Sequence, residues 1–454
     1  MTLLSSVLGI TALLHGAVAF VSLDSQGTQI QRVNKSPRRS SHHQTSPLSL
    51  ELPWIPSDDF GGFYAINVAV GMPPQSQKMV FDTMYSDILL HSNTDPLYLE
   101  ACKAATPVET CSTFDNTTSA TFHGFGNGTF VHIQDDPEDT GEYFSDTLTL
   151  GNIHIKHQTM AVTNRSAFPV ADFGTSPPNQ QDGSRTGTFK QYPNFLESLV
   201  REGVYDSATY SVWLDPSMGP DNNPNTFPPG IVTFGGIDTS LYTGQFTTLP
   251  VVAINSTKVV SVPERWNLAL SAMHLGSSSE NLVKTPEGES CIISTGANVL
   301  GVLNSTLDAL LKSFPEALFN STTSNYQVSC SERNNPKNKL SLTFVDPRHT
   351  DKGLSDAELA KQGYSFTFTI PAAELIWPSD RLAPGGDPST CALAVIPVEA
   401  TGDPCFIGIA QLKSGYWVYD LTNGVISFAT AAYKGEKEGR TIRLPKGGIK
   451  ELFP

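Results

Sequence analysis

The chain has 454 residues and a mass of 49.0 kDa, enough for a few domains of about 100–200 residues or for one large bilobal unit. Hydrophobic residues make up 39% and charged residues 16%, so the composition excludes a disordered chain. The formal net charge is −15 and there is no long basic run, which argues against binding to nucleic acids or anionic membranes. The 36 Gly and 32 Pro residues indicate a turn-rich, β-rich protein.

The first 55 residues have the features of a secretion leader. Residues 2–14 form an apolar run too short to span a bilayer, and Ala17-Val18-Ala19 follows with the spacing of a cleavage site. We therefore predict a signal peptide over residues 1–19 and a secreted protein, extracellular or within the secretory pathway; a buried N-terminal helix is the alternative. Residues 20–55 are polar and contain Arg38-Arg39, which fits a pro-segment, a linker or a disordered tail equally well. No second run of about 18 apolar residues occurs, so we expect no membrane span.

From residue 60 onward the pattern is mostly that of β-strands. We predict strands or hairpins over residues 63–70, 78–81, 121–133 (with a glycine tip), 143–160, 231–234 and 416–428. Apolar residues at helical spacing predict two short helices, over residues 192–204 and 306–314. The pattern restarts near residues 239–249, so we divide the body into an N-terminal lobe, residues 56–240, and a C-terminal lobe, residues 241–433. Residues 434–454 remain as a charged C-terminal tail.

One segment of the first half has a counterpart in the second half. Residues 80–90 (VFDTMYSDILL) and residues 292–300 (IISTGANVL) each contain an apolar strand, a polar residue, Thr, a turn and a second apolar run. One such segment in each half predicts two related lobes built around two matching loops.

The cysteines and glycosylation sequons fit an oxidising, secretory environment. The six cysteines are Cys102, Cys111, Cys291, Cys330, Cys391 and Cys405. Six cysteines allow fifteen pairings, and their spacing does not choose among these. None has the spacing of a zinc site, so we predict no metal site and no cofactor. Asn-x-Ser/Thr sequons, which predict glycosylated surface loops, occur at Asn34, Asn116, Asn127, Asn164, Asn255, Asn304 and Asn320.

Several short segments of the chain form a recognisable series: AINVAVGMPP from Ala65, FDT from Phe81, YFSDTLTLG from Tyr143, YPNFL from Tyr192, IVTFGGID from Ile231, IG at Ile407 and WVYD from Trp417. In these segments the sequence resembles the secreted pepsin-like aspartic proteases, peptidase family A1, of fungal type. They occur in the family's order over roughly residues 60–433. The resemblance implies an all-β, bilobal fold, with two β-barrel-like lobes, a central cleft and few short helices.

The resemblance also implies a catalytic pair that is incomplete here. The family uses two aspartates, one from each lobe, which share a proton and divide the acid and base roles. Asp82 is the retained first aspartate, whereas Ser294 stands where the second belongs. Thr83 and Thr295 match the threonines that cross-link the two loops. Three further positions of these loops are informative: Gly296 is kept, whereas Met84, Tyr85 and Ala297 replace the family's Gly, Ser and Thr.

Further family features are altered or implied. Phe125 matches the flap tyrosine that covers substrate, but it lacks the hydroxyl, and Asn127 beside it begins a sequon. The late family signature ends in Asp, whereas this chain has Ile409 after Gly408. The family's disulfides imply the pairs Cys102–Cys111 and Cys330–Cys391. That leaves Cys291 and Cys405 to pair with each other or to remain as buried thiols.

Three functions remain open at the level of the sequence. The first is a secreted pseudo-enzyme that binds a peptide, a protein or a small molecule in its cleft. The second is a repurposed enzyme that uses Asp82 as a lone acid or base in a fungal secondary-metabolite pathway. The third is an aspartic-type endopeptidase that tolerates the lost aspartate. Asp82 as a buried polar residue without chemistry, and Ser294 as a relic, are the simplest interpretations of those positions. In each case we expect a monomer with no nucleic-acid or membrane partner.

Overall fold

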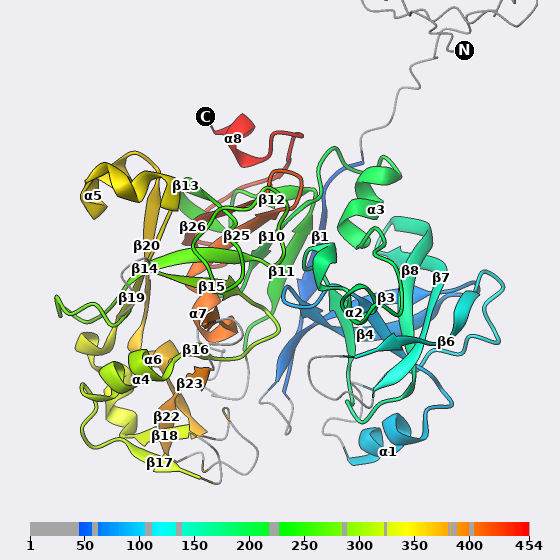
Figure 1. The fold of residues 1–454 in the computed structure, drawn as a ribbon, viewed down its shortest axis with the longest axis horizontal. Helices are drawn as coiled ribbons and strands as arrows, with labels where there is room; N and C mark the ends of the chain where they lie inside the picture. The colour runs from blue at the N-terminus through cyan, green and yellow to red at the C-terminus, as the bar shows by residue number, and fades with distance from the viewer. Residues whose placement is uncertain are drawn as a thin grey trace, which may run out of the picture. The chain divides into compact units, whose positions relative to one another are not determined.

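A computed structural model describes residues 45–56, 62–104, 111–132, 139–217, 227–283, 288–321, 325–379, 382, 387, 389–398 and 404–453. The chain divides into two units, Met1–His43 and Gln44–Pro454, and the description below concerns the second (Figure 1). The predicted signal peptide, the pair Arg38-Arg39 and the sequon at Asn34 lie outside the described residues.

The N-terminal lobe is built on a strongly curved sheet. Its eight strands lie in the order β2 (Trp54–Ile55), β3 (Phe63–Val70), β4 (Gln75–Asp82), β9 (Ala171–Gly174), β5 (Ile88–His91), β8 (Ile153–Arg165), β7 (Thr140–Leu150) and β6 (His123–Val131). An additional pairing of β3 with β7 bends the sheet toward closure, as in a barrel. The short helices α1 (Pro96–Ala104), α2 (Asp182–Thr186) and α3 (Phe195–Arg201) and the 3-10 turn η2 (Pro178–Gln180) accompany it.

The C-terminal lobe contains a seven-stranded and a four-stranded sheet. The larger has the order β20 (Ser365–Ile370), β19 (Leu340–Val345), β14 (Asn267–Leu275), β15 (Glu289–Ile293), β24 (Cys405–Ile407), β16 (Leu300–Leu303) and β23 (Val395–Val398). The smaller has the order β17 (Leu318–Asn320), β18 (Asn325–Val328), β22 (Cys391–Leu393) and β21 (Ile376–Pro378). The helical segments here are α4 (Asn304–Leu311), η3 (Cys330–Asn334), η4 (Pro336–Asn338), η5 (Pro347–Lys352), α5 (Asp356–Lys361), α6 (Ala372–Leu375) and α7 (Ile409–Leu412).

A six-stranded sheet takes strands from both halves of the chain and joins the lobes. Its order is β1 (Leu48–Leu52), β11 (Gly230–Phe234), β10 (Thr209–Trp213), β25 (Gly415–Asp420), β26 (Val425–Ala431) and β13 (Tyr242–Pro250). Because β10 pairs with β25, about 200 residues later in the chain, the two halves share one hydrogen-bonded layer. Figure 1 shows this layer between the two lobes.

Both ends of the predicted body differ from the boundaries drawn on the sequence. The leader range of residues 20–55 overlaps the fold, because β1 pairs with β11 and begins at Leu48. The predicted tail also contains structure: β27 (Thr441–Arg443) pairs with β12 (Gly236–Asp238), and α8 (Ile449–Leu452) buries Ile449. These differences share one cause, since each end pairs with a strand about 200 residues away that no local pattern reveals.

Several predicted elements are confirmed. The hairpin over residues 416–428 is β25–β26, and the strands predicted over residues 143–160 are β7 and β8. The helix predicted over residues 192–204 is α3, which begins with a capping box formed by Asn194 and Glu197. The segment 121–133 differs: residues 123–131 form the single strand β6, and its hairpin partner β7 begins at Thr140.

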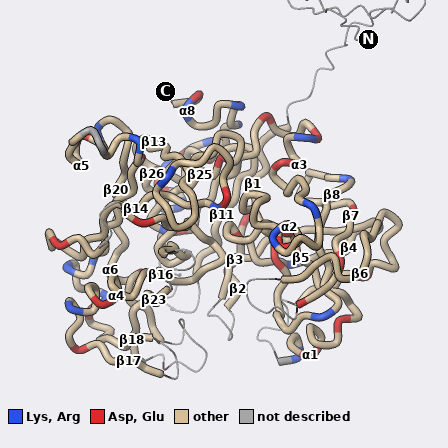
Figure 2. Tube along the Cα trace, in the orientation of Figure 1, with Lys and Arg blue, Asp and Glu red and all other residues tan. Residues whose placement is uncertain are grey.

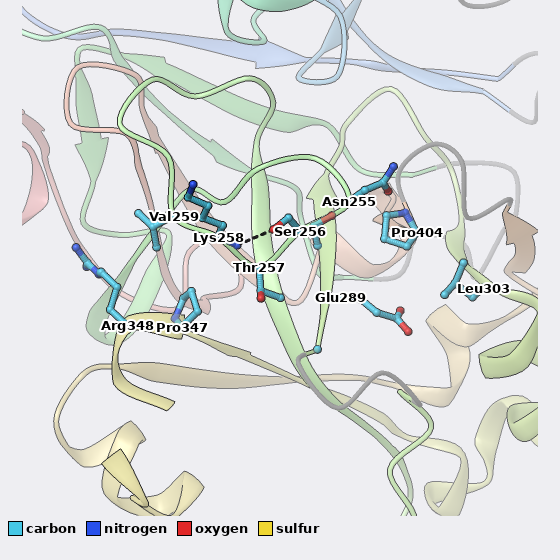
Figure 3. A pocket seen from close by; sticks show the side chains of 12 residues that line it. Asn255, Ser256, Thr257, Lys258, Val259, Glu289, Leu303, Pro347, Arg348 and Pro404 are labelled. Carbon is cyan, nitrogen blue, oxygen red and sulfur yellow. Dashed lines mark hydrogen bonds between the residues drawn. The ribbon is translucent and has the colours of Figure 1, made fainter. Parts of the chain in front are cut away.

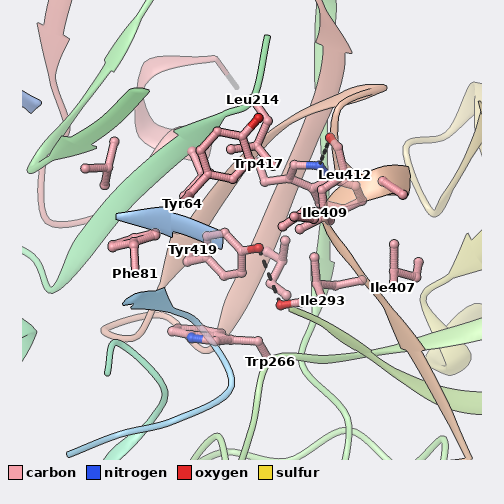
Figure 4. Packing of buried hydrophobic residues seen from close by; sticks show 14 of the residues in the cluster. Tyr64, Phe81, Leu214, Trp266, Ile293, Ile407, Ile409, Leu412, Trp417 and Tyr419 are labelled. Atoms are coloured by element: carbon pink, nitrogen blue, oxygen red, sulfur yellow. Dashed lines mark hydrogen bonds between the residues drawn. The ribbon is translucent and has the colours of Figure 1, made fainter. Parts of the chain in front are cut away.

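The core continues beneath the two matching loops. Phe81 is the next-to-last residue of β4 and Ile293 is the last residue of β15. Both are fully buried, and Figure 4 shows Tyr419 between them. The Tyr419 hydroxyl donates a 3.5 Å hydrogen bond to the Ile293 carbonyl, and burial raises the pKa of that phenol. The loops therefore rest on packed aromatic side chains. Figure 2 shows Lys and Arg scattered over segments of both lobes. In the described part of the chain, no helix is long and apolar enough to cross a membrane.

Candidate active site

The two matching loops occupy equivalent places in the two lobes. The first follows β4, which runs parallel to β9, with Asp82 opposite Gly174. The second follows β15, which runs parallel to β24, with Ile293 opposite Ile407. In each lobe the strand after the loop, β5 or β16, pairs antiparallel with that same partner strand. The repeat seen in the sequence therefore corresponds to a repeated arrangement of strands.

The two threonines hold the loops together by reciprocal hydrogen bonds. The Thr83 hydroxyl donates to the Ile293 carbonyl at 3.0 Å and accepts from the Thr295 amide at 2.9 Å. The Thr295 hydroxyl donates to the Phe81 carbonyl at 2.7 Å and accepts from the Thr83 amide at 3.1 Å. Both threonines are buried, so the cross-link satisfies polar groups at the lobe junction that water does not reach.

Asp82 lies where the two loops meet. Its Oδ1 accepts a 2.6 Å hydrogen bond from the Met84 amide, and the residue is 9% exposed. A Cβ placed on Gly296 of the opposite loop would lie only 2.3 Å from Asp82 Oδ1. Glycine at position 296 therefore permits a close approach between the second loop and the carboxyl group of the first.

Ser294 occupies the corresponding position in the second loop and is fully buried. Its Oγ accepts a 3.1 Å hydrogen bond from the Gly296 amide, and its own amide donates to the Ile407 carbonyl at 2.9 Å. The Ser294 hydroxyl thus accepts a hydrogen bond from the amide two residues later in the chain. The carboxylate of Asp82 accepts an equivalent hydrogen bond from the Met84 amide. Ala297 follows with a methyl group, which offers no hydroxyl to residue 294. The structure brings together Asp82, Thr83, Ser294, Thr295 and Gly296.

Tyr85 points its hydroxyl away from the two loops. The Tyr85 side chain is 2% exposed, and its hydroxyl donates a 3.0 Å hydrogen bond to Asp182 Oδ2. This bond links the loop after β4 to α2. The family's serine at this position is expected to bond to the catalytic aspartate. In this chain the residue instead connects the Asp82 loop to a neighbouring buried cluster.

That cluster is an acid pair, Asp87 and Asp182, which the sequence patterns did not reveal. Both residues are fully buried, and Asp87 Oδ2 accepts a 2.8 Å hydrogen bond from the Asp182 amide. Tyr143 and Tyr192 both donate to Asp87 Oδ1, and His132 Nδ1 lies 2.7 Å from Asp182 Oδ2. Burial, followed by the charge of Asp182, raises the pKa of Asp87 to about 7, and the hydrogen bonds oppose that rise. An aspartate five residues after Asp82 was the only sequence signal for this pair.

Phe125 lies in the extended strand β6 rather than at a hairpin tip. The hairpin continues beyond it, since the His132 amide donates to the Asp139 carbonyl at 2.9 Å. The Phe125 ring is 39% exposed, and its centroid is 5.3 Å from that of Phe189. Phe189 in turn stacks on Tyr143 at 4.5 Å. A row of rings thus connects Phe125 to the acid pair.

Comparison with known proteins agrees with this arrangement of loops and sheets. A family model described as "Eukaryotic aspartyl protease" matches residues 63–431. The chain belongs to the eukaryotic aspartyl protease family. The probable aspartic-type endopeptidase OPSB of Arthroderma benhamiae is 26% identical over 381 residues, covering 83% of this chain and 70% of that protein. The aspartic proteinase yapsin-3 of Saccharomyces cerevisiae is 25% identical over 416 residues, covering 88% and 70%.

A solved structure extends the similarity to three dimensions. The aspartic proteinase from Irpex lacteus matches with a TM-score of 0.63 at 20% identity, covering 86% of this chain and 99% of that one. At this identity the match shows the shared fold. The pepsin-like, bilobal fold implied by the sequence is therefore confirmed for this member of the eukaryotic aspartyl protease family.

Other family positions can be placed around the second loop. Gly408 packs so closely that an added Cβ would lie 2.4 Å from the Val299 carbonyl oxygen. Ile409, at the position of the family's late aspartate, is 1% exposed, and its amide donates to the Ala297 carbonyl at 2.8 Å. This segment therefore supports the second loop through its backbone and an apolar side chain.

The cysteines form three disulfides in the structure. The pairs are Cys102–Cys111, Cys291–Cys405 and Cys330–Cys391. Cys291 and Cys405 are fully buried and join β15 to β24, three residues before Ser294. This bond ties the strand that carries the second loop to its parallel partner.

The predicted sequons lie at the surface, and no metal site is evident in the described residues. Four of the asparagines are exposed and two are half-buried: Asn127, Asn164, Asn255 and Asn304, then Asn116 and Asn320. Within the described ranges, no group of three or more His, Cys, Asp or Glu side chains is arranged to hold a metal ion.

Proposed function

We propose that this member of the eukaryotic aspartyl protease family binds a peptide, a protein segment or a small molecule against Asp82 without efficient peptide hydrolysis. One observation carries the proposal: in the second loop, the fully buried Ser294 hydroxyl accepts a hydrogen bond from the Gly296 amide. Residue 294 therefore has no carboxyl group with which Asp82 could share a proton.

The chemical reason is the division of roles in the family's mechanism. One carboxylate takes a proton from water while the other, protonated, donates to the substrate carbonyl. A serine hydroxyl cannot act as that acid near pH 5, and one positioned acid–base group is worth ~10²–10⁴-fold in rate. Its loss therefore adds about 3–5 kcal/mol to the barrier.

The scaffold for binding remains in place. The threonine cross-link is complete, and the Cys291–Cys405 disulfide supports the second loop. Function in this family resides in the groups on the loops rather than in the fold, so binding can persist when catalysis is lost.

Two alternatives have support of their own. Asp82 is 9% exposed, which supports its use as a lone acid or base on a small molecule, as in a secondary-metabolite pathway. Relatives such as the OPSB protein are named as endopeptidases, which supports retained proteolysis.

The deciding experiment measures cleavage of a denatured protein by purified wild type from about pH 3 to pH 6. We expect cleavage at the level of the Asp82→Ala control. Restoring the family residues together, as Met84→Gly, Tyr85→Ser, Ser294→Asp and Ala297→Thr, should raise activity, whereas Ser294→Asp alone should restore little. Robust wild-type cleavage that disappears in Asp82→Ala would falsify the proposal.

Binding is tested separately. Wild type is incubated with a peptide digest of the denatured protein, and retained peptides are identified by mass spectrometry. Retention that is lost in Asp82→Ala supports a binding role at this site. If wild type retains no peptide but converts a small molecule in an Asp82-dependent manner, the repurposed enzyme becomes the better explanation.

We also propose that the protein is secreted and glycosylated. The signal-peptide pattern at residues 1–19 and the three disulfides support this, because disulfides form and persist in oxidising compartments.

A further inference from the structure

A cavity in the C-terminal lobe has a complete glycosylation sequon as one of its walls. Its volume is about 870 Å³, within the range of small-ligand sites. Figure 3 shows it between the loop Asn255–Val259 and side chains of the seven-stranded sheet and η5. The lining residues are Asn255, Ser256, Thr257, Lys258, Val259, Gly288, Glu289, Ser290, Leu303, Pro347, Arg348 and Pro404.

The loop that carries the sequon is held in a tight turn. The Ala253 amide donates to the Lys258 carbonyl at 2.8 Å. The Lys258 amide donates to Ser256 Oγ at 3.1 Å, as Figure 3 shows. Asn255 has φ = 53°, in the left-handed region that Asn tolerates better than most residues. The side chain of Asn255 is exposed and lies on the cavity wall, so the loop holds the acceptor amide beside the cavity.

The lining suits a neutral, hydroxyl-rich ligand. Ser256, Thr257 and Lys258 offer hydrogen-bonding groups, while Pro347 and Pro404 offer apolar faces. The lining carries charges of both signs: Glu289 is acidic, and Lys258 and Arg348 are basic. Arg348 is already bound to Asp346 by hydrogen bonds of 2.9 and 2.6 Å, whereas Lys258 forms no ion pair among the described residues.

We propose that Asn255 carries an N-linked oligosaccharide and that its first two sugars, both N-acetylglucosamine, lie in this cavity. The inference rests on the proposed secretion. In the modification, Asn255 Nδ2 forms a bond to C1 of the first sugar of a lipid-diphosphate-linked oligosaccharide. The bond from C1 to the diphosphate oxygen breaks, and the amide proton leaves with the lipid diphosphate. No oxidation or reduction is involved.

The covalent link to Asn255 favours the attached oligosaccharide over a free sugar as the occupant of the cavity. A ligand tethered at the rim has an effective concentration in the mM range, so weak contacts with Lys258 and Thr257 suffice to hold it. The sequons at Asn164 and Asn127 differ in this respect. Both asparagines are exposed, on β8 and β6, and neither lines this cavity or the second described cavity, near Phe314. Asn164 is therefore the matched control.

The first test uses unaltered protein from a glycosylating eukaryotic host. Peptide mass spectrometry measures occupancy at Asn255 and Asn164, and an endoglycosidase then trims the folded protein. We expect both sites to be occupied and the Asn255 glycan to be trimmed at least about tenfold more slowly, because its core is sheltered. Occupancy of Asn164 without Asn255 overturns the inference but leaves secretion intact. Occupancy of neither site overturns both, and equal trimming rates overturn the placement in the cavity.

The second test measures stability. Thr257→Ala removes the sequon while it keeps the left-handed Asn255, and we expect the melting temperature to fall by at least about 2 °C. Asn164→Gln should change it by less than that. Lys258→Met should lower the melting temperature of the glycosylated protein but not that of the Thr257→Ala protein. Equal melting temperatures for all variants would overturn the inference. None of these outcomes depends on whether the protein cleaves peptides.

Discussion

The acid pair of the N-terminal lobe predicts an unusual pH dependence of stability. Asp87 and Asp182 are both fully buried, and the pKa of Asp87 is raised from 3.8 to about 7. The proposed perturbation is Asp87→Asn, which removes one ionisable group and keeps the size of the side chain. The measured quantity is the free energy of unfolding by urea, with disulfides intact, from about pH 4 to pH 7.5.

The sign follows from the direction of the shift. Between about pH 4 and pH 7, the folded protein keeps a proton on Asp87 that the unfolded chain has already released. Wild-type stability therefore falls as pH rises through this window. Raising the pKa of Asp87 from 3.8 to about 7 corresponds to a free-energy change of about 4 kcal/mol. Because the group is fully buried, solvent does not screen this effect.

The surrounding groups determine how the variant behaves. Asp87 Oδ1 accepts from Tyr143 and Tyr192, and an amide oxygen can keep these bonds. Asp87 Oδ2 accepts a hydrogen bond from the backbone amide of Asp182. In Asp87→Asn the side-chain NH₂ group takes the place of Oδ2, so two hydrogen-bond donors face each other. We expect a cost of about 1–3 kcal/mol at pH 4.

The stability curves of the two proteins should therefore cross. The amide introduced by Asp87→Asn carries no charge, so the variant lacks most of the decline, and above pH 7 it should equal or exceed wild type. His132 and Arg185 lie 2.7 and 3.8 Å from oxygens of Asp182. Both contacts are present in wild type and in the variant, so they do not account for a difference between the two curves. The control is Asp420→Asn, because burial raises the pKa of Asp420 to about 6. This variant should lack only the part of the fall in stability that ends near pH 6. Parallel curves for wild type and Asp87→Asn would refute the reasoning.

Three further substitutions test contacts between the two matching loops and an ion pair between α6 and the end of α7. Thr295→Val should lower the free energy of unfolding by about 1–3 kcal/mol, because the Thr83 amide and a buried carbonyl lose their partner; unchanged thermal melts would contradict the cross-link. Lys413→Met should cost about 3–5 kcal/mol in urea unfolding, because Glu374, 3.1 Å away, is left as a buried unpaired charge; Glu374→Gln in the same background should recover part of that loss. Gly296→Ala should cost about 1–3 kcal/mol, because the new Cβ would clash with the opposite carboxyl group; a fully stable variant would show that the loops do not meet so closely.

Local sequence patterns were sufficient where neighbouring residues decide the structure. The strand pattern over residues 63–70 predicted β3, and the hairpin predicted over residues 416–428 is formed by β25 and β26. Apolar residues at helical spacing over residues 192–204 predicted α3. The match between the two loops was likewise found from the sequence, because each loop motif is continuous along the chain.

Local patterns failed where a distant strand decides the register. The glycine-rich segment around Gly126 suggests a turn, yet it lies within β6, because β7 provides its partner and bulges absorb the irregular residues. Leu48 and Thr441 carry no local sign of their strands, because their partners β11 and β12 lie about 200 residues away.

For this protein, the sequence alone determined the family resemblance and the order of the elements, and it shows a serine at position 294. Only the tertiary structure decided that Ser294 is buried, that Tyr85 points to Asp182, and that Asp182 lies against Asp87, 95 residues earlier. The physical reason is that hydrogen bonding and burial depend on which segments meet in space. A charge or hydroxyl looks the same in the sequence whether it faces water, a ligand or another buried acid.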